Sequence, residues 1–227
     1  MQTYTMMGDD TNPGVIPLTV REIFQQIENI EDRVFLVRIG YIEIYNERIY
    51  DLLDEKKPEC TKIHEGQQGE VNVLQREVVI NSEEQILQHY DVGNRSRRVG
   101  ETNMNERSSR SHTIFRITIE SREVGKTDEE SAVQVSNLNL VDLAGSESAR
   151  LTKAEGDRLK EGGHINKSLL ALGNVIRVLS EDNASYINYR DSKLTRILSA
   201  ALGGNAMTSI ICTVTPAALD ETYSTLV

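Results

Sequence analysis

The chain has 227 residues, of which 38% are hydrophobic and 26% charged, a balance that describes one ordinary soluble domain with a substantial core. Its two cysteines, Cys60 in a charged stretch and Cys212 in an apolar run, exclude a disulfide framework and fit a reducing compartment. No apolar run approaches the roughly 20 residues of a membrane-spanning helix, so the sequence predicts a cytosolic protein.

Charge is distributed unevenly along the chain. The formal net charge of −10 argues against an acidic partner. Between Ser148 and Ala200, however, nine Lys/Arg stand against six Asp/Glu, a local balance of +3, so the remaining residues carry −13. One segment is therefore basic within an acidic molecule.

The first half of the chain contains two patterns of regular structure. Residues 34–46, VFLVRIGYIEIYN, alternate and are rich in β-branched and aromatic side chains, which predicts a strand. Ser82 to Gln85 have the spacing of a capping box, and Gly93 offers a stop, so a short helix is predicted between them.

The second half alternates strands with helices. Strands are predicted from Thr113, and from Val135 to Asp142 with a turn at Gly145. After Lys160, apolar residues recur at steps of four and three, the period of a long amphipathic helix. The members of this stripe are Ile165, Leu169, Leu172, Ile176 and Leu179. A shorter helix over 193–202 should stop at Gly203, and residues 209–216 resemble a buried strand. Such alternation indicates an α/β layered domain.

The segment NERSSRSH, residues 105–112, concentrates polar side chains that suit phosphate chemistry. Hydroxyl groups can orient water, coordinate magnesium or bind phosphate oxygens, and arginine balances anionic charge. The alternative interpretation is a polar surface turn.

The segment LNLVDLAGSE, residues 138–147, has the Walker-B arrangement of an apolar strand that ends in a carboxylate. Asp142 would reach a magnesium shell, and Gly145 would let the backbone approach a phosphate because it has no Cβ. Alone, an acidic strand end followed by glycine is more often a simple turn. Together the two segments predict a switch pair around a nucleotide.

These motifs resemble those of kinesin motor domains. NxxSSRSH and DLAGSE are similar to that family's switch I and switch II, and YRDSKLTRIL, residues 189–198, is similar to its filament-binding helix. The segments TYTMMG, SSRSHTIFR and ALGGNA are most similar in sequence to the centromere-associated, CENP-E-like group. The resemblance implies a kinesin-type P-loop NTPase fold, with a central, mostly parallel sheet flanked by helices on both faces.

The resemblance also implies roles in binding ATP and magnesium. Magnesium would be held by Thr3, Ser109 and Asp142, partly through water, and Tyr4 would face the adenine. Ser109 and Gly145 would contact the γ-phosphate, and Arg110 would close the site by pairing with Glu147. The nucleotide-binding set implied by the family is Thr3, Tyr4, Asn105, Ser108, Ser109, Asp142 and Gly145.

The family's partner is the microtubule, whose tubulin surface is acidic. The resemblance assigns microtubule binding to the basic segment, with Lys160, Lys167, Arg190, Lys193 and Arg196 as its contacts. Lys160 and Lys167 are seven positions apart and share a helix face. The alternative interpretation of such a charge cluster is a solvated helix surface.

The start of the sequence departs from the family pattern. Gln2 stands where kinesins have the lysine of GQTxSGKT, and the glycine-rich residues before it are absent. A P-loop works through its backbone N–H groups and its lysine. We therefore expect residues 1–227 to be a partial motor domain, incomplete at both ends, and inactive as written.

Two functions follow from these patterns. The first is an ATP-dependent microtubule motor domain with a microtubule-stimulated ATPase activity. The second is a non-catalytic microtubule-binding module derived from a kinesin. The resemblance further implies a cytoplasmic location on microtubules, extending to the spindle or kinetochore, homodimerisation through segments outside these residues, and no nucleic-acid or membrane partner.

Overall fold

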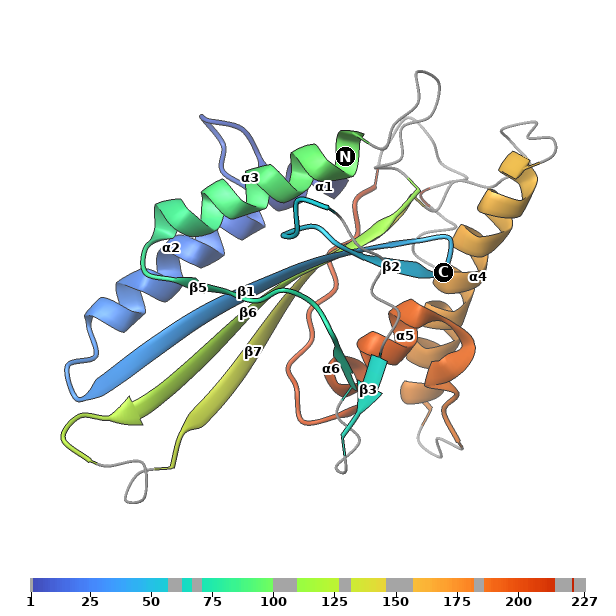
Figure 1. Cartoon of the computed structure of the whole chain (residues 1–227). Helices are drawn as coiled ribbons and strands as arrows, with labels where there is room; N and C mark the ends of the chain where they lie inside the picture. Colours follow the sequence, from blue (N-terminus) through green and yellow to red (C-terminus); the bar gives the residue numbers. More distant parts are fainter. Residues whose placement is uncertain are drawn as a thin grey trace.

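A twisted sheet forms the centre of the molecule in the computed structural model (Figure 1). The structure describes residues 2–56, 63–66, 71–99, 110–126, 132–145, 157–181, 186–214 and 222. The sheet has the strand order β2-β1-β6-β7, with β5 also paired to β1. Its strands are β1 (Arg33–Tyr45), β2 (Arg48–Asp51), β5 (Val78–Ile80), β6 (His112–Glu123) and β7 (Gln134–Asp142). A separate hairpin consists of β3 (Ile63–Glu65) and β4 (Val71–Val73).

Every strand pairing within the described residues is antiparallel, so the expectation of a mostly parallel sheet is wrong for this part of the chain. The chain reverses direction between β1 and β2 at Asn46 and Glu47, both with positive φ, as a two-residue hairpin turn requires. The connection from Glu123 to Gln134 is also too short for a parallel crossover. Helix α3 (Glu83–Val99) does follow β5 and precede β6, but these strands lie on opposite edges of β1.

The two faces of the sheet carry separate cores, which confirms the α/β class with helices on both faces. Alternate residues of the paired strands, such as Ile39 and Ile117, face α1 (Gln2–Met7), α2 (Val15–Glu28) and α3. The intervening residues, such as Ile42 and Ile114, face the other way. That second side is covered by α4 (Asp157–Leu179), α5 (Lys193–Ile197) and α6 (Ser199–Gly203), and the 3₁₀ turn η2 (Tyr189–Asp191) contacts α4 and α5.

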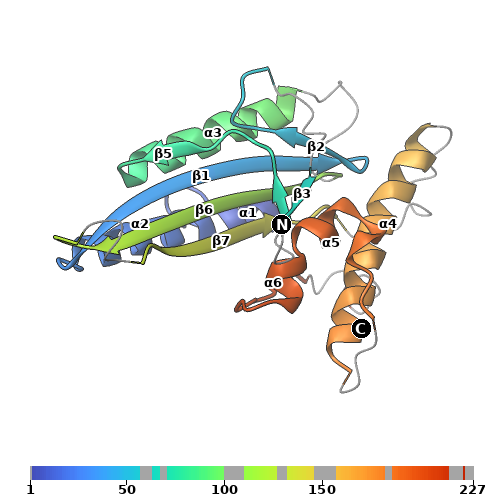
Figure 2. The same ribbon diagram turned by 60° about the horizontal axis from the view of Figure 1, so that its bottom comes forward.

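Helices α4, α5 and α6 gather near one end of the sheet, and the opposite end projects beyond them (Figure 2). The projecting end contains the start of β1, the end of β6 and the start of β7. None of the helices in the described part of the chain combines the length and hydrophobicity needed to cross a membrane.

Helix α3 begins where the capping box predicts but continues past Gly93. The Ser82 hydroxyl accepts a hydrogen bond from the Gln85 amide at 3.4 Å, and the Gln85 side chain accepts one from the Asn81 amide at 3.0 Å. Gly93 does not end the helix. A Cβ at this position would lie 2.4 Å from the ring of Tyr41, so the glycine serves close approach of helix and sheet.

Helix α4 is present as predicted, but its buried stripe is offset by one position. Ser168, Ala171 and Val175 are 2%, 6% and 3% exposed, whereas Ile176 and Leu179 are each 36% exposed. Small side chains on the buried face allow α4 to lie close to its neighbours. The predicted helix over 193–202 is divided at Leu198 into α5 and α6, and it ends at Gly203 as expected.

Residues 209–214 do not form the predicted strand. They have no regular structure, and Ile210 and Ile211 are 63% and 56% exposed. A strand is stabilised by hydrogen bonds to a neighbouring strand, and none of the described strands pairs with this segment. Apolar composition alone therefore gave the wrong prediction here.

Candidate functional site

The candidate site centres on Asp142, the last residue of β7. Its side chain is 4% exposed. The Oδ2 atom accepts a hydrogen bond from the Thr3 hydroxyl at 3.1 Å and pairs with the Arg97 Nη1 at 3.2 Å. The Oδ1 atom is buried and has no hydrogen-bond partner among the described residues. Thus the structure brings together Thr3 and Asp142, two of the residues expected to bind magnesium, and leaves one carboxylate oxygen available for a ligand.

Arg97, in the last turns of α3, is a site residue that the sequence analysis missed. Its side chain is 3% exposed. Besides Asp142, it binds the Ser111 hydroxyl through Nε at 3.2 Å and the Ser111 carbonyl through Nη2 at 2.9 Å. The signal that identifies it is helical spacing: Arg97 follows the buried residues Ile86, Tyr90 and Gly93 at steps of four, three and four. It therefore lies on the face of α3 that packs on the sheet.

His112, the first residue of β6, lies beside this cluster and was also missed. Its Nδ1 accepts a hydrogen bond from the Ala144 amide at 3.0 Å, and its Nε2 lies 2.8 Å from the Ser168 hydroxyl of α4. Burial, with a smaller contribution from the positive charge of Arg97, lowers the pKa of His112 from 6.5 to about 4. The ring is therefore neutral near pH 7.

The start of α1 presents Thr3 and Tyr4 to different surroundings. Both residues are exposed, Tyr4 to 55%, but the Thr3 hydroxyl donates to the buried carboxylate of Asp142. The Tyr4 hydroxyl donates to Asp9 at 2.8 Å, which raises the pKa of Tyr4. Asp9 also accepts from the side chain and amide of Thr11 and from the Asn12 amide, so the pKa of its carboxyl is held well below its usual range. The aromatic ring is thus fixed by its hydroxyl group with much of its surface accessible.

The predicted switch residues fall partly within the described structure. Arg110 directly precedes Ser111, whose carbonyl accepts a hydrogen bond from Arg97. Gly145 directly follows Ala144, whose amide donates a hydrogen bond to His112. Four predicted site residues, Asn105, Ser108, Ser109 and Glu147, lie outside the described residues.

The predicted filament-binding residues lie on the other side of the sheet. Arg190 in η2 donates to Glu65 of β3 at 2.7 Å, and Arg196 in α5 donates to the same carboxylate at 2.9 Å. Both hydrogen bonds lower the pKa of the Glu65 carboxyl, and the bond from Arg196 contributes more than the bond from Arg190. Lys193 donates through its backbone amide to Glu47 at 2.9 Å. No motif in the sequence indicated that Glu65 would meet these arginines.

The α4 lysines are described to different extents. Lys167 is exposed on α4, next to the buried Ser168. Lys160 lies in the same helix, but its side chain is outside the described part of the structure. Leu172 of α4 packs in the same cluster as Leu194 of α5, so the two helices that carry the predicted contacts are in direct contact.

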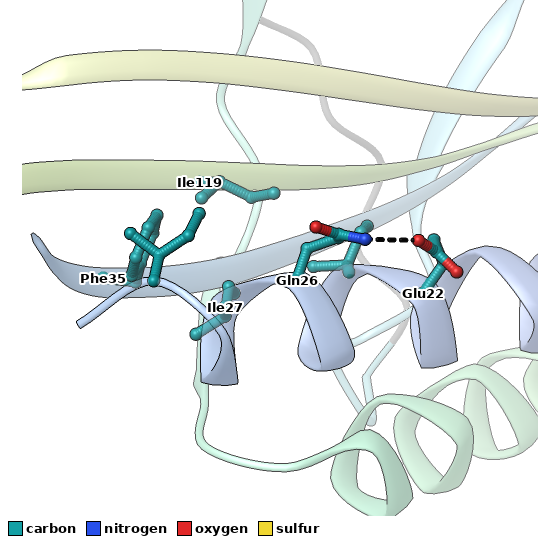
Figure 3. Close-up of a pocket in the computed structure, with 7 residues that line it drawn as sticks. Glu22, Gln26, Ile27, Phe35 and Ile119 are labelled. Atoms are coloured by element: carbon teal, nitrogen blue, oxygen red, sulfur yellow. Dashed lines mark hydrogen bonds between the residues drawn. The ribbon is translucent and has the colours of Figure 1, made fainter.

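An apolar pocket of about 220 Å³ lies between α2 and the strands β1 and β6 (Figure 3). Phe35, Ile119 and Ile27 line it, and a hydrogen bond of 2.7 Å from Gln26 to Glu22 lies at its edge. It contains none of the predicted site residues, so it is separate from the cluster around Asp142.

Sequence comparisons agree with the motifs. A family model described as the kinesin motor domain matches residues 2–227. The chain is 54% identical over 233 residues to Kinesin-like protein KIN-7L of Oryza sativa subsp. japonica, which covers 99% of this chain and 36% of the relative. It is also 54% identical over 230 residues to Centromere-associated protein E of Homo sapiens, covering 99% of this chain and 8% of that protein. The chain therefore spans about a third or less of these relatives.

Solved structures show the same fold. A structure of a KIF14 dimer with AMP-PNP in complex with a microtubule has a TM-score of 0.85 and 35% identity, covering 99% of this chain and 66% of that one. The structure of a fast kinesin has a TM-score of 0.80 and 44% identity, covering 90% of this chain and 58% of that one. With the family model matching nearly every residue, the chain belongs to the kinesin motor domain family.

Proposed function

We propose that this chain forms the nucleotide-responsive, microtubule-binding part of an ATP-hydrolysing motor domain. The observation that carries the proposal is the partly buried hydrogen bond from Thr3 to Asp142, beside an Asp142 oxygen that has no partner within the described residues. Family membership supplies the expectation of ATP, and the geometry is suited to the ion that accompanies it.

A magnesium ion fits the donor set at this position. The Thr3 hydroxyl donates its single hydrogen to Asp142, which leaves its lone pairs for a cation. Magnesium prefers oxygen ligands and commonly uses one or two carboxylates together with phosphate oxygens and water. Thr3 and Ser109 would bind it directly or through water, and the free Asp142 oxygen would accept a hydrogen bond from its water shell. When bound, the ion would neutralise phosphate charge.

The remaining nucleotide contacts are those that the family resemblance implies. The exposed ring of Tyr4, fixed through Asp9, would stack on the adenine. Asn105 and Ser108 would lie beside the nucleotide. The Gly145 amide would donate to the γ-phosphate, and Ser109 would orient the attacking water. Arg110 would pair with Glu147 to close the site and exclude bulk water.

The basic side of the sheet would bind the acidic tubulin surface. Arg190, Lys193 and Arg196 lie close together on η2 and α5, and Lys167 is exposed on the adjoining helix α4. Lys160 would extend this patch along α4. Opposite charge attracts a partner, and added salt screens that attraction.

A substitution at Thr3 tests the nucleotide site. Thr3→Ala should weaken Mg²⁺-dependent binding of a fluorescent ATP analogue by about tenfold or more, because a group that orients the ion is lost. Thr208→Ala provides the control, since the Thr208 hydroxyl donates to the Ala201 carbonyl of α6, away from Asp142. Equal affinities for the wild type and Thr3→Ala would contradict the assignment.

A double substitution that removes two positive charges tests the proposed microtubule-binding surface. Lys193→Ala with Arg196→Ala should weaken co-sedimentation with microtubules and flatten its dependence on salt. The control is Arg21→Ala with Lys126→Ala, which removes the same charge from α2 and from the turn after β6. Equal losses in both double variants would indicate a general charge effect and would reject this surface.

The second candidate function is a non-catalytic microtubule-binding module. It is favoured by Gln2, which stands where kinesins have lysine. Measuring ATP hydrolysis with and without microtubules separates the two functions. Microtubule-stimulated turnover supports the motor domain, and microtubule binding without turnover supports the module.

A further inference from the structure

His112 joins two elements on which the proposed function depends. At one side its Nδ1 accepts the amide of Ala144, two residues after Asp142. At the other side its Nε2 meets the hydroxyl of Ser168, in the middle of α4. Ala144, His112 and Ser168 are 1%, 2% and 2% exposed, so water does not compete for these bonds. A single imidazole ring thus spans the distance from the nucleotide side to the helix on the filament side.

The hydrogen-bond directions at this ring are determined by its partners. A backbone amide can only donate, so the Nδ1 that accepts from Ala144 carries no proton. In the neutral ring, the proton is then on Nε2 and is donated to the Ser168 hydroxyl. The low pKa of about 4 keeps this neutral form near pH 7. The ring therefore acts as a spacer of fixed length with one bond at each end.

Each end of this spacer is adjacent to a residue with a proposed contact. Ala144 precedes Gly145, whose amide would meet the γ-phosphate. Ser168 follows Lys167, which is exposed on α4 and would face the filament. A shift of either segment changes the position of the bond at the other end.

We propose that His112 is a positioning residue that couples the segment after Asp142 to α4, so that nucleotide state and microtubule affinity change together. This inference rests on the proposed function. Coupling between two sites is commonly worth a 5- to 150-fold change in affinity, and loss of one bond in the bridge should remove much of it.

Two substitutions open the bridge at its α4 side. In His112→Asn, the shorter side chain can still accept from Ala144 but cannot reach Ser168. Ser168→Ala leaves the Ala144 bond intact and removes the partner of Nε2. Matched controls are His89→Asn on α3 and Ser180→Ala beyond α4, where the Ser180 hydroxyl donates to the Arg177 carbonyl one turn earlier.

The readout is the ratio of microtubule dissociation constants in ADP and in AMP-PNP, measured in the protein by co-sedimentation with paclitaxel-stabilised microtubules. Both bridge variants should lower this ratio by about fivefold or more, and the controls should keep it. Because both substitutions break the same hydrogen bond, the double variant should lower the ratio no further than either single variant.

Three results would overturn the inference. The first is a bridge variant that keeps the wild-type ratio, and the second is one that weakens binding equally in both nucleotides, as a purely structural role predicts. The third is a wild-type protein with equal affinity in ADP and AMP-PNP, which would overturn the proposed function as well.

A spectroscopic measurement tests the bridge independently of activity. In ¹⁵N-labelled protein, NMR of the His112 ring should show a neutral Nε2–H tautomer at pH 7. Ser168→Ala should shift the Nε2 resonance and leave Nδ1 unprotonated, while Ser180→Ala should shift neither. A Nδ1–H tautomer in the wild type would overturn the inference, because Nδ1 could not then accept from Ala144.

Discussion

The two ends of the central sheet differ in how completely they are covered. Where β7 ends, Asp142 lies between α1 and α3, and His112 contacts α4. At the projecting end, Val34 and Leu36 of β1 and Val135 of β7 are 49%, 40% and 55% exposed. Buried polar groups interact strongly because water is excluded, and they cost more when left unpaired. The comparison shows that the polar side chains of the candidate site are buried at the covered end.

Breaking the ion pair at the covered end should have the largest effect. Arg97→Ala leaves the Asp142 carboxylate buried without its cation, and losing one partner of a buried pair costs about 3 to 5 kcal/mol. The free energy of unfolding, measured by urea denaturation, should fall by this amount. Arg177→Ala removes an exposed arginine paired with Glu181 and should cost less than about 1 kcal/mol. Similar losses for the two variants would mean that Arg97 is not held in a buried pair.

Acid should destabilise the covered end through His112. Its pKa is about 4 in the folded protein and near 6.5 in the unfolded chain, so the unfolded state binds more protons between these values. The contribution to stability is therefore full above pH 6.5 and is lost as pH falls towards 4, by about 1.4 kcal/mol per unit and about 3 kcal/mol in total.

Urea denaturation across this pH range checks that effect. His112→Asn should show a shallower loss of stability below pH 6.5 than the wild type. Parallel profiles for the wild type and His112→Asn would contradict the low pKa.

Gly93→Ala should have an intermediate effect. Its Cβ would lie 2.4 Å from the Tyr41 ring, and overpacking of this kind costs about 1 to 3 kcal/mol. Gly173→Ala is the matched change in α4, where a Cβ meets nothing within 4 Å. That variant should gain up to about 1 kcal/mol from helix propensity. Thermal unfolding of both variants measures the difference in sign, and destabilisation by both would contradict it.

The smallest effect is expected at the projecting end. Val135→Thr places a hydroxyl group on an exposed surface and should change stability by less than about 0.5 kcal/mol. Val37→Thr, at a position 4% exposed, buries the same hydroxyl and should cost more than about 1 kcal/mol. Val37 neighbours Leu36 on β1, so this pair contrasts the two faces of the sheet at the projecting end. Equal values in chemical denaturation would mean that both faces are equally accessible there.

Local patterns predicted most elements of the fold but not their pairing. The strands β1, β6 and β7 and the helix α4 follow from periodicity within each segment. Strand direction depends on how segments far apart in the chain meet, and the mostly parallel sheet implied by the family resemblance is not found among the described strands. The strand prediction at residues 209–214 was wrong for the same reason, because a strand requires a neighbouring strand as well as suitable composition.

The parts of the candidate site that lie within continuous sequence motifs could be predicted. Thr3 and Asp142 were expected from family resemblance, and they are in contact. The contacts of Arg97 with Asp142, His112 with Ser168 and Arg196 with Glu65 join residues 45, 56 and 131 positions apart. No short motif contains such pairs. The helical spacing of Arg97 is the one sequence signal that could have shown which way this residue faces.

The bridge formed by Glu65 changes what the basic surface offers to a partner. Arg190 and Arg196 are already occupied by one carboxylate, so an acidic surface that takes over these arginines replaces an existing counter-charge. Binding there is an exchange reaction, and its driving force is the difference between two ion pairs of the same chemical kind. Because that difference depends on how well each carboxylate fits the two guanidinium groups, the surface selects partners by shape more than by total charge.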